Sequence, residues 1–328
     1  MDTRQLKYFV AIVECGSMGK AAEKLYVAQP SLSQQMGRLE SEFGTSLLLR
    51  SQRGVTPTAA GQALYARSRA ILRQMEQLKQ HVKEGASAES GTVAVGLPTT
   101  MVSVLAMPLI ERVQQRYPGI HLQLIESMSG AITELLASAR LDLAILFRAS
   151  DTLGVTAWPL LEEQLFVMGE PGDGVAAEAQ SCALSALNGV RMVAPGATNG
   201  LRLLLERVFA RENLELNIVA DIDSLPTLLS IAESGHACTI LPVSALAQRE
   251  AARCPKIRAI VAPELRRPAS VCWSSTTMMS SATVAVCRMI VELVEDLTAS
   301  GVWKGISLPD EQSRRTLAEA LRAPERHA

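Results

Sequence analysis

The chain has 328 residues, 48% of them hydrophobic, and a formal net charge of −1. That length is enough for two or three ordinary domains. A transmembrane helix needs about 20 consecutive apolar residues, and no stretch of this sequence comes close to that length. The chain also does not open with a basic leader followed by an apolar segment. We therefore expect a cytoplasmic protein rather than a membrane or exported one. Six cysteines without C-x-x-C spacing, and four scattered histidines, argue against a metal site or a disulfide framework.

The charge is distributed unevenly along the chain. Residues 1–87 hold 12 Lys and Arg against 7 Asp and Glu, whereas residues 88–328 hold 20 against 26. A basic end on an acidic body attracts a polyanion to one end only. The charge pattern therefore favours a nucleic-acid-binding segment at the N-terminus.

Three short helices are predicted in this basic segment. Apolar residues at i, i+3, i+4 and i+7 from Leu6 predict the first, and small residues around Ala21 predict the second. The third spans about residues 30–41 and keeps its apolar residues on one narrow face. Its opposite face presents hydroxyls, amides and a guanidinium, which match base edges and phosphates. That face carries Pro30, Ser31, Ser33, Gln34, Arg38 and Ser41.

Two short strands around a basic tip follow, over residues 47–49 and 50–55. They suit a wing that touches the phosphate backbone, and an ordinary solvated turn is the alternative for Arg50 and Arg53.

Three motifs in this segment resemble a known family. They are LKYFVAIVECGSMGKAAEKL, AQPSLSQQMGRLE and LLLRSQRGVTPTAAG, and they resemble the winged helix-turn-helix of LysR-type transcriptional regulators. LKYFVAIVE and RGVTPTAAG are most like the subgroup of the nitrogen assimilation control protein. One departure is Ala28, where many relatives carry a serine that would cap the third helix.

The resemblance implies a sequence-specific regulator bound to double-stranded promoter DNA, with RNA polymerase as a further partner. It implies base contacts in the major groove from the third helix and phosphate or minor-groove contacts from the wing. The implied DNA-binding residues are Gln29, Pro30, Ser31, Ser33, Gln34, Arg38, Arg50, Arg53 and Thr56.

A single long helix is predicted over residues 58–84, after the DNA-binding domain of residues 1–57. At about 1.5 Å per residue it is roughly 40 Å long. Its apolar residues are spaced as in a coiled-coil seam, so we expect it to pair with a second copy, giving a homodimer and further a tetramer. A helix packed on its own domain is the alternative. The predicted seam consists of Leu64, Ile71, Met75, Leu78 and Val82, and a hinge is expected over residues 85–91.

The remaining chain alternates short apolar strands with helices, which is typical of α/β domains with largely parallel sheets. We expect subdomain I over residues 92–163 and 267–300, and subdomain II over residues 164–266. One strand of subdomain II is expected at residues 164–169. The resemblance implies a two-lobed, periplasmic-binding-protein-like effector domain.

A small-molecule effector is expected between these lobes, because ligands of open α/β sheets bind beyond the carboxyl ends of strands and near helix N-termini. Arg148, the charged member of the predicted set, suggests a carboxylate or sulfonate, and an exposed loop arginine is the alternative. Each hydroxyl taken singly could equally be a helix N-cap. The set is Pro98, Thr99, Thr100, Met101, Ser127, Met128, Ser129, Phe147, Arg148, Ala197, Thr198 and Asn199.

Catalysis is not expected, because no nucleophile-elbow, dinucleotide-binding or P-loop motif occurs. Two other functions stay open: a solute-binding protein without DNA activity, and a DNA-binding regulator that needs no effector. Residues 301–328 are expected to be mostly polar, and either one short amphipathic helix or disordered.

Overall fold

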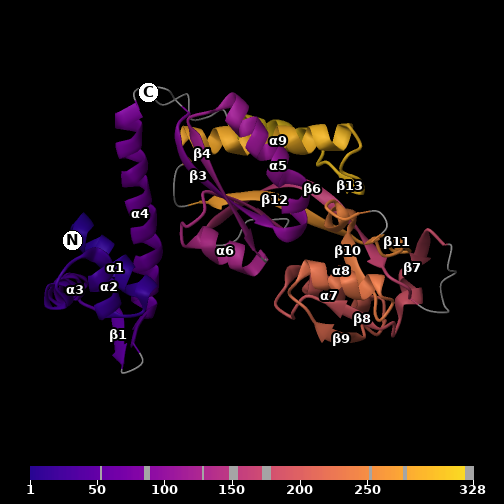
Figure 1. Cartoon of the computed structure of the whole chain (residues 1–328), viewed down its shortest axis with the longest axis horizontal. Helices are drawn as coiled ribbons and strands as arrows, with labels where there is room; N and C mark the ends of the chain where they lie inside the picture. Colours follow the sequence, from indigo (N-terminus) through magenta and orange to yellow (C-terminus); the bar gives the residue numbers. More distant parts are fainter. Residues whose placement is uncertain are drawn as a thin grey trace. The chain divides into compact units, whose positions relative to one another are not determined.

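The computed structural model describes residues 1–51, 54–84, 89–127, 129–147, 154–171, 179–250, 253–275 and 279–321. The chain divides into two compact units, one built mainly of residues 1–87 and the other of residues 88–136 and 141–328 (Figure 1).

The N-terminal unit is a bundle of helices with a small β-hairpin. Asp2 begins the first helix through a reciprocal capping box with Gln5, and Gly16 ends it in the left-handed conformation. The buried stripes of the first three helices meet around Phe9, Ile12 and Leu32. The elements are α1 (Thr3–Cys15), α2 (Met18–Leu25), α3 (Gln29–Phe43), the antiparallel strands β1 (Leu48–Ser51) and β2 (Gly54–Pro57), and α4 (Ala59–Glu84).

Glu14 at the end of α1 ties three helices of this unit together. Its carboxylate accepts a hydrogen bond from Arg69 of α4, another from the Tyr65 hydroxyl of α4 at 3.4 Å, and one from Lys24 Nζ of α2 at 3.3 Å. The base of the long helix is therefore attached to the helices that precede it.

Subdomain I of the C-terminal unit has a mixed sheet between helices. Its parallel strands are β3 (Gly91–Pro98), β4 (Ile120–Ser127) and β5 (Leu143–Leu146), and β12 (Arg266–Ser274) pairs antiparallel to β5. Helices α5 (Thr99–Arg116) and α9 (Ser281–Ala299) cover one face, and α6 (Ser129–Ala137) lies on the other (Figure 1). β3 is buried on both faces, as its continuous apolar sequence predicts.

Strand β6 (Val155–Met168) continues from subdomain I into subdomain II. It pairs with β12 through residues 155–164, and its last residues pair with β10 (Thr239–Pro242) and β11 (Ile257–Val261). β11 also pairs with β7 (Ser181–Ala183). The parallel strands β8 (Met192–Ala194) and β9 (Ile218–Asp221), together with α7 (Gly200–Arg211) and α8 (Leu225–Glu233), complete subdomain II, with the 3-10 turns η1 (Leu184–Leu187) and η2 (Val243–Leu246).

The expected strand at residues 164–169 is too short, because β6 begins at Val155. The sequence WPLLEEQ contains a proline and two adjacent glutamates, which are untypical of a strand interior. Both glutamates are accommodated: Glu162 is exposed, whereas Glu163 is buried beside a cation from β12. Strands β7 and β11 were not predicted at all.

The C-terminal extension is folded as far as Leu321, and of the two alternatives that the sequence left open it forms the short amphipathic helix. Trp303, Leu317 and Leu321 are buried in the core of subdomain I, and Arg288 Nη2 donates to the Leu321 carbonyl at 2.7 Å. The extension adds β13 (Ile306–Ser307), which pairs with β6, and α10 (Glu311–Ala320), which begins at the N-cap Asp310. Residues 322–328 lie outside the described part of the chain.

Candidate functional site

The third helix, α3, presents an apolar side to the protein and a polar side to solvent. Leu32, Met36 and Leu39 are buried at 1% exposure or less. The predicted DNA contacts that are exposed on this helix are Gln29, Pro30, Ser31, Gln34 and Arg38. Helix α3 therefore offers amide, hydroxyl and guanidinium groups along one accessible face.

The N-terminus of α3 carries no side-chain cap. Ala28 stands at the N-cap without a hydrogen bond from its side chain, as the departure from the family pattern predicts, and Pro30 in the first turn removes one backbone N–H. The other N–H groups of the first turn can donate to a phosphate oxygen.

The wing is linked to this helix by two side chains. Arg50 of β1 donates from Nη1 to Ser33 Oγ at 3.1 Å, and its Nη2 lies 3.9 Å from Glu40 Oε2. Glu40 in turn accepts from the backbone N–H groups of Leu47 and Leu48, at 2.8 and 3.1 Å. Thr56 of β2 is exposed, and Arg53 lies outside the described residues.

Helix α4 exposes several apolar side chains. Ile71, Met75 and Leu78 are 41%, 36% and 64% exposed, respectively. Leu64, also in the predicted seam, packs against the core of the N-terminal unit, and the side chain of Val82 is not described. These exposed residues repeat at four and three positions, as coiled-coil seams do.

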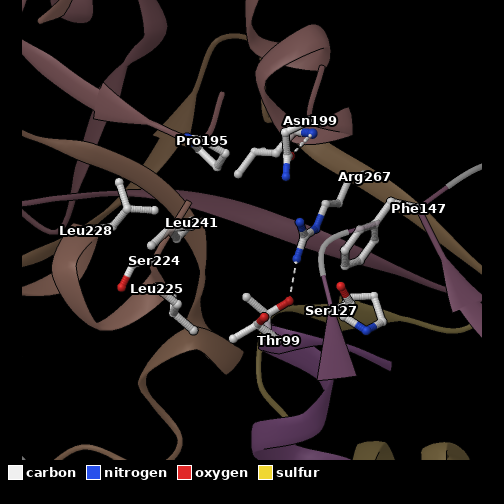
Figure 2. Close-up of a pocket in the computed structure, with 13 residues that line it drawn as sticks. Thr99, Ser127, Phe147, Pro195, Asn199, Ser224, Leu225, Leu228, Leu241 and Arg267 are labelled. Carbon is white, nitrogen blue, oxygen red and sulfur yellow. Dashed lines mark hydrogen bonds between the residues drawn. The ribbon is translucent and has the colours of Figure 1, made fainter. Parts of the chain in front are cut away.

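A cavity of about 50 Å³, partly open to solvent, lies where the strands and helix N-termini of both subdomains meet (Figure 2). Most of its wall is apolar, with hydroxyls and one amide from the ends of strands and the starts of helices. Its lining residues are Pro98, Thr99, Thr100, Ser127, Phe147, Pro195, Asn199, Leu201, Ser224, Leu225, Leu228, Leu241 and Arg267.

The cavity brings together several residues of the predicted set. Pro98, Thr99, Thr100, Ser127, Phe147 and Asn199 line it. Met101 is fully buried in the core of subdomain I, and Ala197 and Thr198 are absent from its lining. Met128, Arg148 and the side chain of Ser129 lie outside the described residues.

Arg267 was missed by the sequence reasoning, although it is the charged residue among the described cavity-lining residues. It lies within β12, whereas the sequence analysis considered only residues that follow the carboxyl end of a strand. Figure 2 shows its guanidinium reaching toward the middle of the labelled residues, with Phe147 beside it; its Cζ lies 3.5 Å from the ring centroid.

The Arg267 guanidinium is balanced by a buried carboxylate. Its Nε and Nη2 donate to Glu163 Oε2 at 2.9 and 2.6 Å, and both side chains are at most 5% exposed. Nη2 also donates to Thr100 Oγ1 at 2.9 Å, and Ser244 donates to Glu163 Oε1 at 2.8 Å. Burial lowers the pKa of Arg267 from its ordinary value, and the Glu163 carboxylate opposes that shift.

The cysteines are placed as unreactive thiols in most cases. All six are free; Cys182, Cys238, Cys272 and Cys287 are buried. Burial raises the pKa of Cys238 to about 11 and that of Cys287 to about 12. His236 bonds to the Ser234 hydroxyl at 2.8 Å.

Neither a metal-binding cluster nor a membrane-spanning helix is found in the part of the chain that the structure describes. No group of three or more His, Cys, Asp or Glu that could hold a metal occurs among the described residues. No described helix combines the length and apolarity that crossing a bilayer requires.

Comparison with known proteins places both units in one family. Residues 3–62 match the family "Bacterial regulatory helix-turn-helix protein, lysR family", and residues 86–295 match the "LysR substrate binding domain". The chain is 36% identical to the nitrogen assimilation regulatory protein nac of Klebsiella aerogenes over 298 residues, which are 90% of this chain and 95% of that protein. Its identity to the nac protein of Escherichia coli K12 is 39%, over 75% and 79% of the two chains.

The fold agrees with these matches. A full-length variant of OxyR from Pseudomonas aeruginosa superposes with a TM-score of 0.69 at 22% identity, covering 90% of this chain and 95% of that one. An N-terminal helix-turn-helix and a C-terminal α/β domain are thus shared by both chains. The chain therefore belongs to the LysR family of DNA-binding transcriptional regulators.

Proposed function

We propose that this regulator works as a homodimer or higher oligomer that reads promoter DNA with α3 and is controlled by a small molecule in the interlobe cavity. The proposal places it in the cytoplasm, where bacterial DNA is found. The observation that carries it is the combination of an exposed polar face on α3 with a cavity lined from both lobes of the second unit.

DNA reading is assigned to the exposed side chains of α3, with Gln34 and Arg38 as base readers. Amide and guanidinium groups can each make two hydrogen bonds to one base edge. Arg50, Arg53 and Thr56 of the wing are assigned to phosphates or the minor groove, which orient the domain without reading sequence.

Self-association is assigned to the exposed face of α4. Leu78 and Ile71 bury their apolar area only against a partner, and a parallel or antiparallel copy of α4 offers the same seam. A dimer presents two α3 helices and so reads two half-sites, which multiplies specificity.

The cavity suggests a mainly apolar ligand with a hydrogen-bond acceptor. Seven of its lining residues are proline, phenylalanine or leucine, and the charge of Arg267 is already matched by Glu163. A free carboxylate or sulfonate, the sequence-based expectation, would face this neutral pair rather than a lone cation. We therefore expect an aromatic amide to bind more tightly than the aromatic carboxylic acid that has the same ring.

Two experiments test the proposed function. A duplex selected from a random pool by the full-length protein should be retarded in a gel shift by wild type and much less by Gln34→Ala or Arg38→Ala. Thermal shift with the acid and amide pairs tests the cavity: ligand stabilisation should be smaller in Thr99→Val and Ser127→Ala, two lining residues, than in wild type. Equal binding by the DNA variants, or equal stabilisation of the cavity variants, would contradict the respective assignment.

A further inference from the structure

The Glu163–Arg267 pair lies where the chain passes from one lobe to the other. Glu163 of β6 stands directly opposite Arg267 of β12 in the strand register. Two residues further along β6, Leu165 donates its backbone N–H to the Leu265 carbonyl at 2.8 Å, and the strand then pairs with β10 and β11 of subdomain II. The ion pair is therefore at the crossover between the lobes.

Each member of the pair is held by a different lobe. Thr100 lies in the first turn of α5, whose apolar face belongs to the core of subdomain I. Ser244 lies in η2, whose neighbours Ala245 and Leu246 belong to the core of subdomain II. The chain of bonds runs from Thr100 Oγ1 through Arg267 and Glu163 to the Ser244 hydroxyl.

One end of this chain is open to the cavity. Thr100 and Arg267 both line it, whereas Glu163 and Ser244 do not. The Arg267 Nη1 amino group has no hydrogen-bond partner among the described residues, and Nη2 is shared between Thr100 and Glu163. A ligand acceptor that enters the cavity meets this guanidinium before it meets any other charged group of the described lining.

We propose that Thr100, Arg267, Glu163 and Ser244 form an interlobe latch, and that a ligand acceptor binds the unpartnered Arg267 Nη1 and draws the guanidinium away from Thr100. The second half rests on the proposed function, because it requires a ligand in this cavity. Without ligand the four side chains fix the position of α5 against η2. When the ligand engages Arg267, the Thr100 bond is lost and the lobes are held through Glu163 and Ser244 only.

The latch is a buried network, and its members are positioning residues. Removing one of them should destabilise the strands at the crossover between the lobes. Losing one hydrogen bond to a charged group raises a local opening equilibrium by about tenfold or more. Removing the Thr100 or Ser244 hydroxyl should therefore raise opening of the crossover strands without removing any charge.

The test compares amide hydrogen exchange in peptides from residues 160–168 and 262–270 of the full-length protein. Thr100→Val and Ser244→Ala should exchange about tenfold faster than wild type in both peptides, and Thr100→Ser should restore the wild-type rate. Thr239→Val is the matched control, because Thr239 is buried next to β6 in the strand register and its hydroxyl has no partner among the described residues. It should exchange at the wild-type rate.

A second readout measures the bend of a selected duplex bound to each variant without any small molecule. Thr100→Val should alter the bend and Thr239→Val should not. Exchange rates and bends of Thr100→Val that equal those of Thr239→Val or Thr100→Ser would overturn the latch. If wild type binds no DNA, the proposed function fails, while the exchange comparison still decides the latch on its own.

Discussion

Arg50 in the wing donates a hydrogen bond to Ser33 in α3, with 3.1 Å between Nη1 and Oγ. Two residues predicted separately to contact DNA are therefore bonded to each other in the free protein. Glu40 lies 3.9 Å from the same guanidinium and holds the start of β1 by accepting from its backbone N–H groups. Wing and helix thus form one polar surface, and we propose that its parts bind DNA together.

This shared surface predicts that substituting a residue that reads bases and substituting one that contacts DNA phosphates reduce DNA affinity in different ways. Gln34→Ala and Arg38→Ala should weaken binding to a selected duplex by roughly 10- to 100-fold and change binding to random DNA much less, since each good base contact discriminates by about 1–3 kcal/mol. Arg50→Ala should weaken both and reduce the slope of log affinity against log salt by about 1. Gel shifts at several salt concentrations measure both quantities. Thr45→Ala, exposed beyond the end of α3, is the control, and a loss that is equal on both duplexes for Gln34→Ala would contradict its role.

The exposed face of α4 predicts a change in oligomeric state. Leu78→Glu should convert the dimer to a monomer at micromolar concentration, because a charge replaces a residue that we place in the seam and that is 64% exposed in the single chain. Gln62→Glu adds the same charge to an exposed position of α4 outside the seam and should leave the dimer intact. Light scattering after size exclusion measures the mass, and a Leu78→Glu dimer would exclude this seam.

Periodicity was sufficient for the helices of the N-terminal unit and for the parallel strands of subdomain I. The predicted third helix coincides with α3, and apolar runs at residues 92–97, 121–126 and 142–147 predict β3, β4 and β5. The missed part of β6 and the missed strand β11 share a physical cause. Each contains a charged residue, Glu163 in β6 and Arg258 in β11, whose burial depends on partners far away in the sequence. Glu163 and Arg267 are 104 residues apart, so neither residue's own neighbourhood indicates that it is buried. The rule that ligands bind beyond the carboxyl ends of strands led to the cavity residues at strand ends. It could not lead to Arg267, which lies within a strand.

The buried ion pair predicts strongly unequal effects of single and double substitution. Glu163→Gln should destabilise the effector domain by about 3–5 kcal/mol, because it leaves the buried Arg267 cation without its counter-charge. Glu163→Met with Arg267→Met should cost much less, since two apolar side chains remove both charges together. Urea unfolding followed by circular dichroism gives the free energies. If the loss of unfolding free energy in the double variant equals the sum of the losses in Glu163→Met and Arg267→Met, the two residues do not act as a pair.

The environments of the buried cysteines predict that their thiols react slowly with electrophiles and oxidants. Burial raises the pKa of Cys238 to about 11 and that of Cys287 to about 12, so at about pH 8 almost none of either thiol is ionised. Cys15 and Cys254, which are partly exposed, should react first with a maleimide, and the buried four should react only on unfolding. Mass spectrometry of a labelling time course measures the order. A disulfide formed on brief treatment with hydrogen peroxide would contradict this prediction.

The C-terminal extension predicts a loss of stability in subdomain I when its apolar anchors are removed. Leu317 and Leu321 are each 2% exposed against the core that α9 also covers, so Leu317→Ala should destabilise the protein by about 2–5 kcal/mol. The neighbouring Gln312, exposed on the same helix, provides the control Gln312→Ala, which should change stability by less than about 0.5 kcal/mol. The same core includes residues of α5, the helix whose first turn reaches the cavity. Loss of Leu317 should therefore also speed amide exchange in α5, and unchanged exchange there would mean that the extension acts on α9 alone.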